Sequence, residues 1–166
     1  MEQIPSLSFS VSAASRKPRK NEVDGKDYYF LRVDEFKKKI EEQAFVEWEE
    51  VYKDHFYGTL ISEVERIRNE GRHVVFDVDV KGGINIKKQF GKDVLAVFVE
   101  PPSVEALEQR LRDRATDSEK DIQTRIEKAK EELAFAPFFD VIIVNNDLNI
   151  AKKEVLKVVK EFIENK

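Results

Sequence analysis

The sequence has no cysteine and only two histidines among its 166 residues. Without cysteine there can be no disulfide and no cysteine nucleophile, and His55 and His73 alone are too few for a typical zinc site. No apolar run approaches the roughly 20 residues needed to cross a membrane, and the chain does not open with a basic and then apolar signal segment. We therefore expect a cytoplasmic protein with no membrane partner.

The charge balance excludes a general attraction to nucleic acid. Hydrophobic residues make up 41% of the chain and charged residues 37%, and the net charge is −4. A chain of this length and composition is expected to form one soluble domain, 1–166, with a sizeable core. An anionic small molecule would need local groups of cations to bind, and we expect no nucleic-acid partner.

The sequence also lacks the Gly-x-x-x-x-Gly-Lys-[Ser/Thr] loop that cradles the phosphates of a nucleoside triphosphate in many α/β enzymes. Gly25-Lys26 and Gly91-Lys92 have neither the preceding glycine nor the following hydroxyl residue. No segment of the chain therefore predicts a site of this type for a phosphate donor.

What is present indicates an α/β fold. Apolar, β-branched runs predict buried parallel strands, and a more polar run predicts a fourth strand: His73–Val78, Val94–Val99, Val141–Val144 and Leu7–Ser12. Helical patterns separate them, at Ser103–Arg114, Ser118–Phe135 and Asn149–Ile163. Strands joined through helices imply crossovers, and hence a parallel sheet with helices on both faces.

Residues 27–59 show a different pattern. Short aromatic-rich strands are predicted on either side of a short helix, at Tyr28–Leu31, Asp34–Glu42, Phe45–Glu50 and His55–Tyr57. This segment is expected to form a small mixed insertion lying over the main sheet.

Arg16 and Arg19 are candidates for binding a phosphate. A guanidinium group can contact two phosphate oxygens at once, and Pro18 between the arginines restricts the backbone. The hydroxyls of Tyr28 and Tyr57 are candidates to complete a phosphate site. A solvated basic turn and buried aromatic packing are the alternatives, and the residues alone leave them open.

Glu47 is a candidate for recognising a purine. Guanine presents N1–H and N2–H donors that one carboxylate can accept together, whereas adenine has no such pair of donors on that edge. Ser12 and Thr59 are candidates for further hydrogen bonds to the base. The alternative is a strand glutamate that simply faces solvent.

Asp77 and Asp79 follow a predicted buried strand, where ligands bind in open α/β sheets. We expect Asp77 to order a magnesium-bound water or the acceptor phosphate, and Asp79 to accept a hydrogen bond from the guanine amino group. A bend at Gly82-Gly83 is expected to bring the next helix close to the ligand. A simple turn between strand and helix is the alternative.

Arg110, Arg114 and Arg125 form a candidate cationic lid. Arg110 and Arg114 are four residues apart on one predicted helix, and Arg125 lies on the next helix. Such cations can stabilise a phosphoryl group during transfer. A charged helical hairpin with pairs such as Glu108–Arg112 is the alternative, which spacing alone favours.

Taken jointly, these segments resemble the guanylate kinase family over essentially the whole chain. The resemblance includes four further segments at matching spacing: Glu22–Tyr28, Pro101–Ser103, Arg114–Glu119 and Val144–Leu148. It implies a fold like that of the P-loop kinases, with a GMP-binding insertion at 27–59 and a helical lid at 110–125. It implies GMP and ATP as substrates and Mg²⁺ with the ATP.

The resemblance also assigns roles to the candidate residues. The guanine would be held by Ser12, Glu47, Thr59 and Asp79, and its phosphate by Arg16, Arg19, Tyr28 and Tyr57. Asp77 would stand near the metal and the reacting phosphates, and the lid would contribute Arg110, Arg114 and Arg125.

The chain departs from the family pattern at its N-terminus. In the family, a first strand and the phosphate-binding loop precede the segment that begins here at Leu7. Both are therefore expected to be missing from this sequence. We therefore expect weak activity or none from the chain as printed. The alternative function is a non-catalytic module of the same family that binds GMP or a phosphorylated protein.

Overall fold

The computed structural model describes residues 3–113 and 118–165, apart from the side chain of Tyr52. The chain forms two compact units, residues 1–86 and 87–166. The expected parallel strands are present as one parallel pair in each unit.

The first unit contains the pair β1 (Leu7–Phe9) and β6 (His73–Val75). The two strands run parallel, with Phe9 opposite Val75, and the N–H of Ser10 donates to the carbonyl of Val75 at 2.9 Å. Strand β6 ends three residues before the predicted boundary at Val78. Helix α2 (Ile61–Asn69), which the sequence analysis did not predict, precedes β6 and packs against it.

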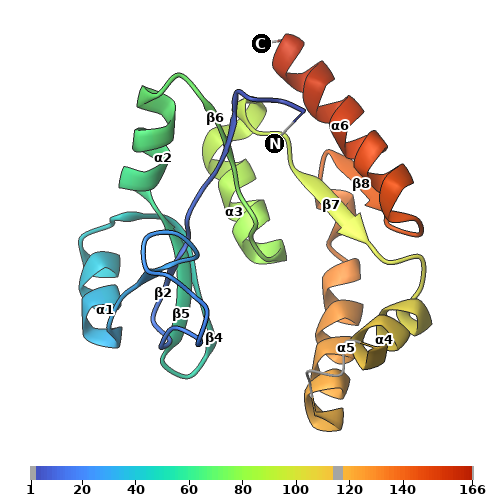
Figure 1. Cartoon of the computed structure of the whole chain (residues 1–166), viewed down its shortest axis with the longest axis horizontal. Helices are drawn as coiled ribbons and strands as arrows, with labels where there is room; N and C mark the ends of the chain where they lie inside the picture. Colours follow the sequence, from blue (N-terminus) through green and yellow to red (C-terminus); the bar gives the residue numbers. More distant parts are fainter. Residues whose placement is uncertain (1–2, 114–117, 166) are drawn as a thin grey trace. The chain divides into compact units, whose positions relative to one another are not determined.

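The first unit also contains a mixed sheet in the order β3-β2-β5-β4, of which Figure 1 labels β2, β5 and β4. Its strands are β2 (Ala13–Ala14), β3 (Tyr29–Phe30), β4 (Phe45–Tyr52) and β5 (His55–Leu60). Strands β4 and β5 form an antiparallel hairpin, and α1 (Val33–Glu41) lies beside the sheet. The short strands and the helix predicted within 27–59 are therefore present.

An aromatic stack fixes α1 on this sheet. Phe36 of α1 is fully buried, and its ring stacks on Phe45 of β4 at 4.4 Å and on Phe56 of β5 at 5.4 Å between centroids. The same cluster includes Ala13, whose small side chain allows the helix and the sheet to approach. The burial of these rings is the main apolar contribution to this part of the unit.

Helix α3 (Val80–Phe90) corrects one prediction. The bend expected at Gly82-Gly83 does not occur, because the helix begins at Val80 and includes both glycines. The carboxylate of Asp79 accepts the N–H of Gly82 at 2.8 Å, as an N-cap side chain does, and so starts the helix earlier.

The second unit contains the parallel pair β7 (Val97–Glu100) and β8 (Val141–Val144). Its helices are α4 (Val104–Asp113), α5 (Glu119–Leu133) and α6 (Leu148–Glu164), with short 3-10 turns η1 (Gly91–Asp93) and η2 (Ala136–Phe138). Leu111 of α4 packs with Ile122 and Ile126 of α5. The caps that begin the helices explain their starting points: Ser103, Ser118 and Asp147.

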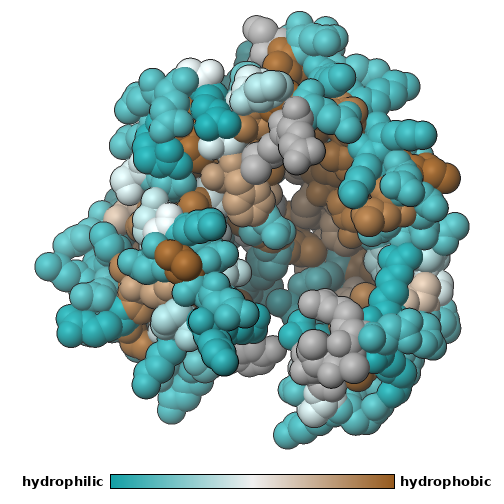
Figure 2. Space-filling view, in the orientation of Figure 1, coloured by the Kyte–Doolittle hydropathy of each residue, from teal (hydrophilic) through white to brown (hydrophobic). Residues whose placement is uncertain are grey.

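The surface agrees with the high content of charged residues. The face shown in Figure 2 is mainly hydrophilic, with scattered hydrophobic residues. No helix within residues 3–113 and 118–165 is both long and apolar enough to span a bilayer.

Replacing Phe36 by alanine should lower the free energy of unfolding by about 3–5 kcal/mol, because it removes a fully buried ring between two aromatic partners. Val23→Ala is the control, since Val23 is 54% exposed and its loss should change stability by less than about 0.5 kcal/mol. Urea denaturation of both variants tests this. Equal midpoints for Phe36→Ala and the unaltered chain would contradict the proposed core.

Candidate functional site

The hairpin of β4 and β5 presents a row of polar side chains on one face. Glu47 lies opposite Thr59 and Glu49 lies opposite Tyr57. Because alternate residues of a strand point to the same side, these four side chains share one face of the sheet. This surface, which we call the polar face, contains three of the residues that the sequence analysis selected.

Glu47 is buried at the centre of the polar face, with 9% of its surface exposed. Its Oε1 accepts a hydrogen bond from the hydroxyl of Thr59 at 2.7 Å. Burial raises the pKa of the Glu47 carboxyl, and the nearby charge of Asp79 adds to the rise. The alternative of a glutamate that faces solvent is therefore wrong.

Helix α3 begins against this carboxylate. A Cβ atom added to Gly82 would lie only 3.0 Å from Oε2 of Glu47 and 3.3 Å from Oδ1 of Asp79. The missing side chain of Gly82 thus allows the first turn of α3 to approach the polar face. Asp79 is brought beside Glu47 by this contact, as its predicted role requires.

Glu49 belongs to the site although the sequence analysis did not select it. A hydrogen bond with the carboxyl of Asp79, and then burial, raise the pKa of Glu49, while Lys81 opposes the rise through its Nζ at 3.1 Å. A neighbouring carboxyl group disfavours the charged form of a carboxylate. The available signal was the i, i+2 spacing from Glu47, which places both side chains on one face of a strand.

Arg16 is held in place by several contacts. Its two terminal nitrogens donate to Glu22 at 2.6 and 2.7 Å, and its Nε donates to the hydroxyl of Tyr57 at 3.1 Å. The guanidinium also lies over the ring of Tyr28, 4.9 Å from the centroid. Only 14% of the arginine side chain is exposed, so it is ordered rather than a solvated basic residue.

The ion pair with Arg16 changes the pKa of Glu22. The hydrogen bond from Arg16, followed by that from the backbone N–H of Arg19, lowers the pKa of Glu22 to about 2. In return, Glu22 raises the pKa of Arg16. The side chain of Arg19 is exposed, and its backbone N–H is 2.7 Å from Glu22. Glu22 therefore fixes both the side chain of Arg16 and the backbone of Arg19.

Tyr28 and Tyr57 contact each other and Arg16. The rings of Tyr28 and Tyr57 meet edge to face, with centroids 6.1 Å apart. Tyr57 contacts Arg16 and lies opposite Glu49, so it connects the arginine to the carboxylates. Ser12 directly precedes β2, where its carbonyl accepts the N–H of Tyr29 at 2.9 Å.

Asp77 stands apart from these contacts. It is exposed and lies between β6 and α3, two residues before Asp79. Mg²⁺ is usually bound by one or two carboxylates together with substrate phosphates, so Asp77 is a suitable residue. Within the described part of the chain, no group of three or more carboxylates or histidines forms a metal site on its own.

The predicted lid lies in the second unit. Arg110 is exposed on α4 and donates to the carbonyl of Asn146 at 3.2 Å, and Arg125 is exposed on α5. Arg114 falls outside the described residues. The alternative pair is present, since Arg112 donates to Glu108 at 2.8 Å and also pairs with Glu119. The role of the lid remains a prediction.

Comparison with known proteins gives the family. The family model described as guanylate kinase matches residues 2–166. The chain belongs to the guanylate kinase family. It is 52% identical over 163 residues to the guanylate kinase of Bacteroides fragilis, and the matched region covers 98% of this chain and 80% of that protein. It is 50% identical to the guanylate kinase of Porphyromonas gingivalis, over 95% of this chain and 84% of that protein.

A solved structure agrees with this assignment. The crystal structure of guanylate kinase from Anaplasma phagocytophilum matches with a TM-score of 0.77 and 28% identity, covering 94% of this chain and 76% of that one. The resemblance of this chain to the guanylate kinase family is therefore confirmed, and so is the fold class of these kinases.

The burial of Glu47 predicts a specific dependence of stability on pH. Because its pKa is raised above the ordinary 4.5, the folded protein binds more protons than the unfolded chain between 4.5 and the raised value. The contribution of Glu47 to stability therefore falls as the pH rises through that window. The melting temperature of Glu47→Gln should exceed that of the unaltered chain at about pH 8, and the difference should shrink towards about pH 4.

Glu41→Gln is the matched control, because Glu41 is an exposed carboxylate on α1. Its melting temperature should follow that of the unaltered chain at every pH. A constant difference between Glu47→Gln and the unaltered chain across the range would show that burial does not raise the pKa of Glu47.

Proposed function

We propose that this chain binds GMP on the polar face of its first unit and is a guanylate kinase, which transfers the γ-phosphoryl group of ATP to GMP. The single observation that carries the proposal is the buried carboxylate of Glu47, which has a hydroxyl donor on one oxygen and a helix start beside the other. Such a group favours a ligand that brings its own N–H donors.

Guanine meets that requirement. The two donors on its N1–N2 edge would bind the Glu47 carboxylate, and Asp79 would accept the second hydrogen of the amino group. Thr59 already orients Oε1 of Glu47 through a bond of 2.7 Å, and Ser12 is proposed to add a further bond to the base. Adenine lacks the paired donors and would leave the buried carboxylate without them.

The phosphate of GMP is proposed to bind at the other end of the polar face. Arg16 is ordered there by Glu22 and Tyr57, so its charge is held in one place before the ligand arrives. Tyr57 accepts from Arg16, which leaves its own hydroxyl hydrogen available to donate to a phosphate oxygen. Tyr28 and Arg19 would add a second hydroxyl and a second cation.

Mg²⁺ bound with ATP would neutralise charge on the transferring phosphoryl group. Asp77 is the residue proposed to stand near it, since it follows β6 and its carboxylate suits this ion. Arg110, Arg114 and Arg125 are proposed to act as a lid. The contribution of the chain is to orient the GMP phosphate and to keep its charges balanced. A cytoplasmic location remains a prediction.

Calorimetric titration with GMP and AMP tests the proposed specificity. The unaltered chain should bind GMP more tightly than AMP, and Glu47→Gln should weaken GMP binding by about 10- to 100-fold, the effect of losing a hydrogen bond to a charged group. Glu41→Gln should bind GMP as the unaltered chain does. A preference for AMP, or an unchanged GMP affinity in Glu47→Gln, would overturn the assignment of the guanine site.

Turnover is a separate test, made by coupled detection of ADP release from ATP and GMP. The sequence contains no Gly-x-x-x-x-Gly-Lys-[Ser/Thr] motif, so we expect trace turnover from this chain even where GMP binds well. Turnover in the usual range for kinases, about 1–100 per second, would contradict that expectation.

A further inference from the structure

Helix α2 carries a buried carboxylate that the proposed function does not use. Only 2% of the surface of Glu63 is exposed, and glutamate is rarely buried to this degree unless it is paired. Burial alone would raise its pKa, but hydrogen bonds from Arg66, the N–H of Val11 and the hydroxyl of Tyr29 together hold the pKa of Glu63 below its usual value. Glu63 is thus an ionised group inside the first unit.

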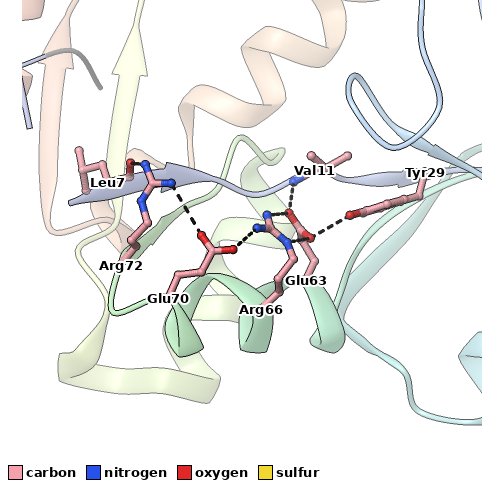
Figure 3. A network of polar contacts seen from close by, with 7 residues as sticks. All are labelled: Leu7, Val11, Tyr29, Glu63, Arg66, Glu70 and Arg72. Atoms are coloured by element: carbon pink, nitrogen blue, oxygen red, sulfur yellow. Dashed lines mark hydrogen bonds and ion pairs between the residues drawn. The ribbon is translucent and has the colours of Figure 1, made fainter. Parts of the chain in front are cut away.

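Each oxygen of Glu63 accepts two hydrogen bonds. Oε1 accepts from the backbone N–H of Val11 at 3.1 Å and from Nη2 of Arg66 at 2.9 Å. Oε2 accepts from the hydroxyl of Tyr29 at 3.0 Å and from Nε of Arg66 at 2.9 Å. Figure 3 shows these groups converging on the carboxylate from α2, from the segment after β1 and from β3. All of its main acceptor positions are therefore filled.

The network continues towards β1, and this fixes Arg66 in turn. Arg66 donates to Glu70 at 2.7 Å, and Glu70 lies 3.8 Å from Arg72. Arg72 donates to the carbonyl of Leu7 at 2.9 Å, as Figure 3 also shows. The carboxylate of Glu63 is thus held from α2 and from the parallel pair of strands.

The two groups that Glu63 holds belong to residues next in the sequence to two proposed ligands of GMP. Val11 precedes Ser12, which is proposed to contact guanine, and Tyr29 follows Tyr28, which is proposed to contact the phosphate. The carbonyl of Ser12 also accepts the N–H of Tyr29 at 2.9 Å. One buried charge therefore ties together the backbone beside a ligand of the base and the backbone beside a ligand of the phosphate.

We infer that Glu63 is a positioning residue of the GMP pocket, which sets the places of Ser12 and Tyr28 through Val11 and Tyr29. This inference rests on the proposed function, and Glu63 itself does not touch the nucleotide. Without its carboxylate, the N–H of Val11 and the hydroxyl of Tyr29 lose their acceptor, and both segments are free to shift. Small displacements of binding groups have large effects on a site that requires several of them at once.

Calorimetric titration with GMP tests the inference on the whole chain. Glu63→Gln keeps the shape of the side chain but removes its charge, and it should raise the Kd for GMP by about tenfold. Tyr29→Phe removes a single donor and should raise the Kd by a smaller factor. Two controls on α2 should keep the Kd of the unaltered chain: Val64→Ala removes a buried apolar group, and Glu65→Gln makes the same change of charge at an exposed position.

The outcomes separate the inference from the proposed function. No heat of binding with the unaltered chain overturns both. Normal binding by the unaltered chain together with an unchanged Kd in Glu63→Gln overturns the positioning role alone. The positioning role is also overturned if Val64→Ala lowers the melting temperature as much as Glu63→Gln does and raises the Kd for GMP by the same factor. Should Glu63→Gln not fold, Tyr29→Phe decides, because an unchanged Kd in that variant contradicts the inference.

Discussion

A charged group can be buried only where partners replace the water it loses, and the first unit is organised by this constraint. Arg16 loses most of its exposure and is met by Glu22 and Tyr57. Glu63 is almost fully buried and is met by Arg66, an N–H and a hydroxyl. Each charge also contacts residues distant in the sequence, Arg16 through Tyr57 and Glu63 through Val11 and Tyr29, so these contacts help to hold the sheets and α2 together.

The constraint is met least well on the polar face, and this is where a ligand has most to contribute. Glu47 has a hydroxyl donor but no cation beside it in the contacts described. The neighbouring carboxyl of Asp79 raises the pKa of Glu49. A pocket that keeps carboxylates at raised pKa values costs stability in the free protein. In the proposed complex, GMP would supply N–H donors to Glu47 and a phosphate to the ordered Arg16. The same arrangement would then account for the proposed base specificity and the proposed phosphate site.

The sequence predicted much of the fold, because apolar periodicity and capping residues are local signals. Ser103 and Asp147 cap the helices predicted at Ser103–Arg114 and Asn149–Ile163, and the strand at Val141–Val144 matches its predicted bounds. The two failures have different causes, one a distant contact and the other a local one. Helix α2 begins at Ile61 with no capping side chain at Leu60, and the N–H of Ile61 donates to the distant carbonyl of Ala44 at 2.9 Å. Helix α3 includes two glycines because the nearby side chain of Asp79 starts it early. For the site, Glu47 and Arg16 followed from residue chemistry, whereas Glu49, Glu22 and Glu63 needed partners that only the folded chain brings together.

The central claim is that Arg16, ordered by Glu22 and Tyr57, anchors the phosphate of a guanine nucleotide. The most direct measurement compares the affinities for GMP and guanosine in the unaltered chain and in Arg16→Ala. The account predicts that the unaltered chain prefers GMP strongly, that Arg16→Ala loses most of this preference, and that guanosine binding changes little. A preference for GMP over guanosine that is the same in both proteins would contradict it.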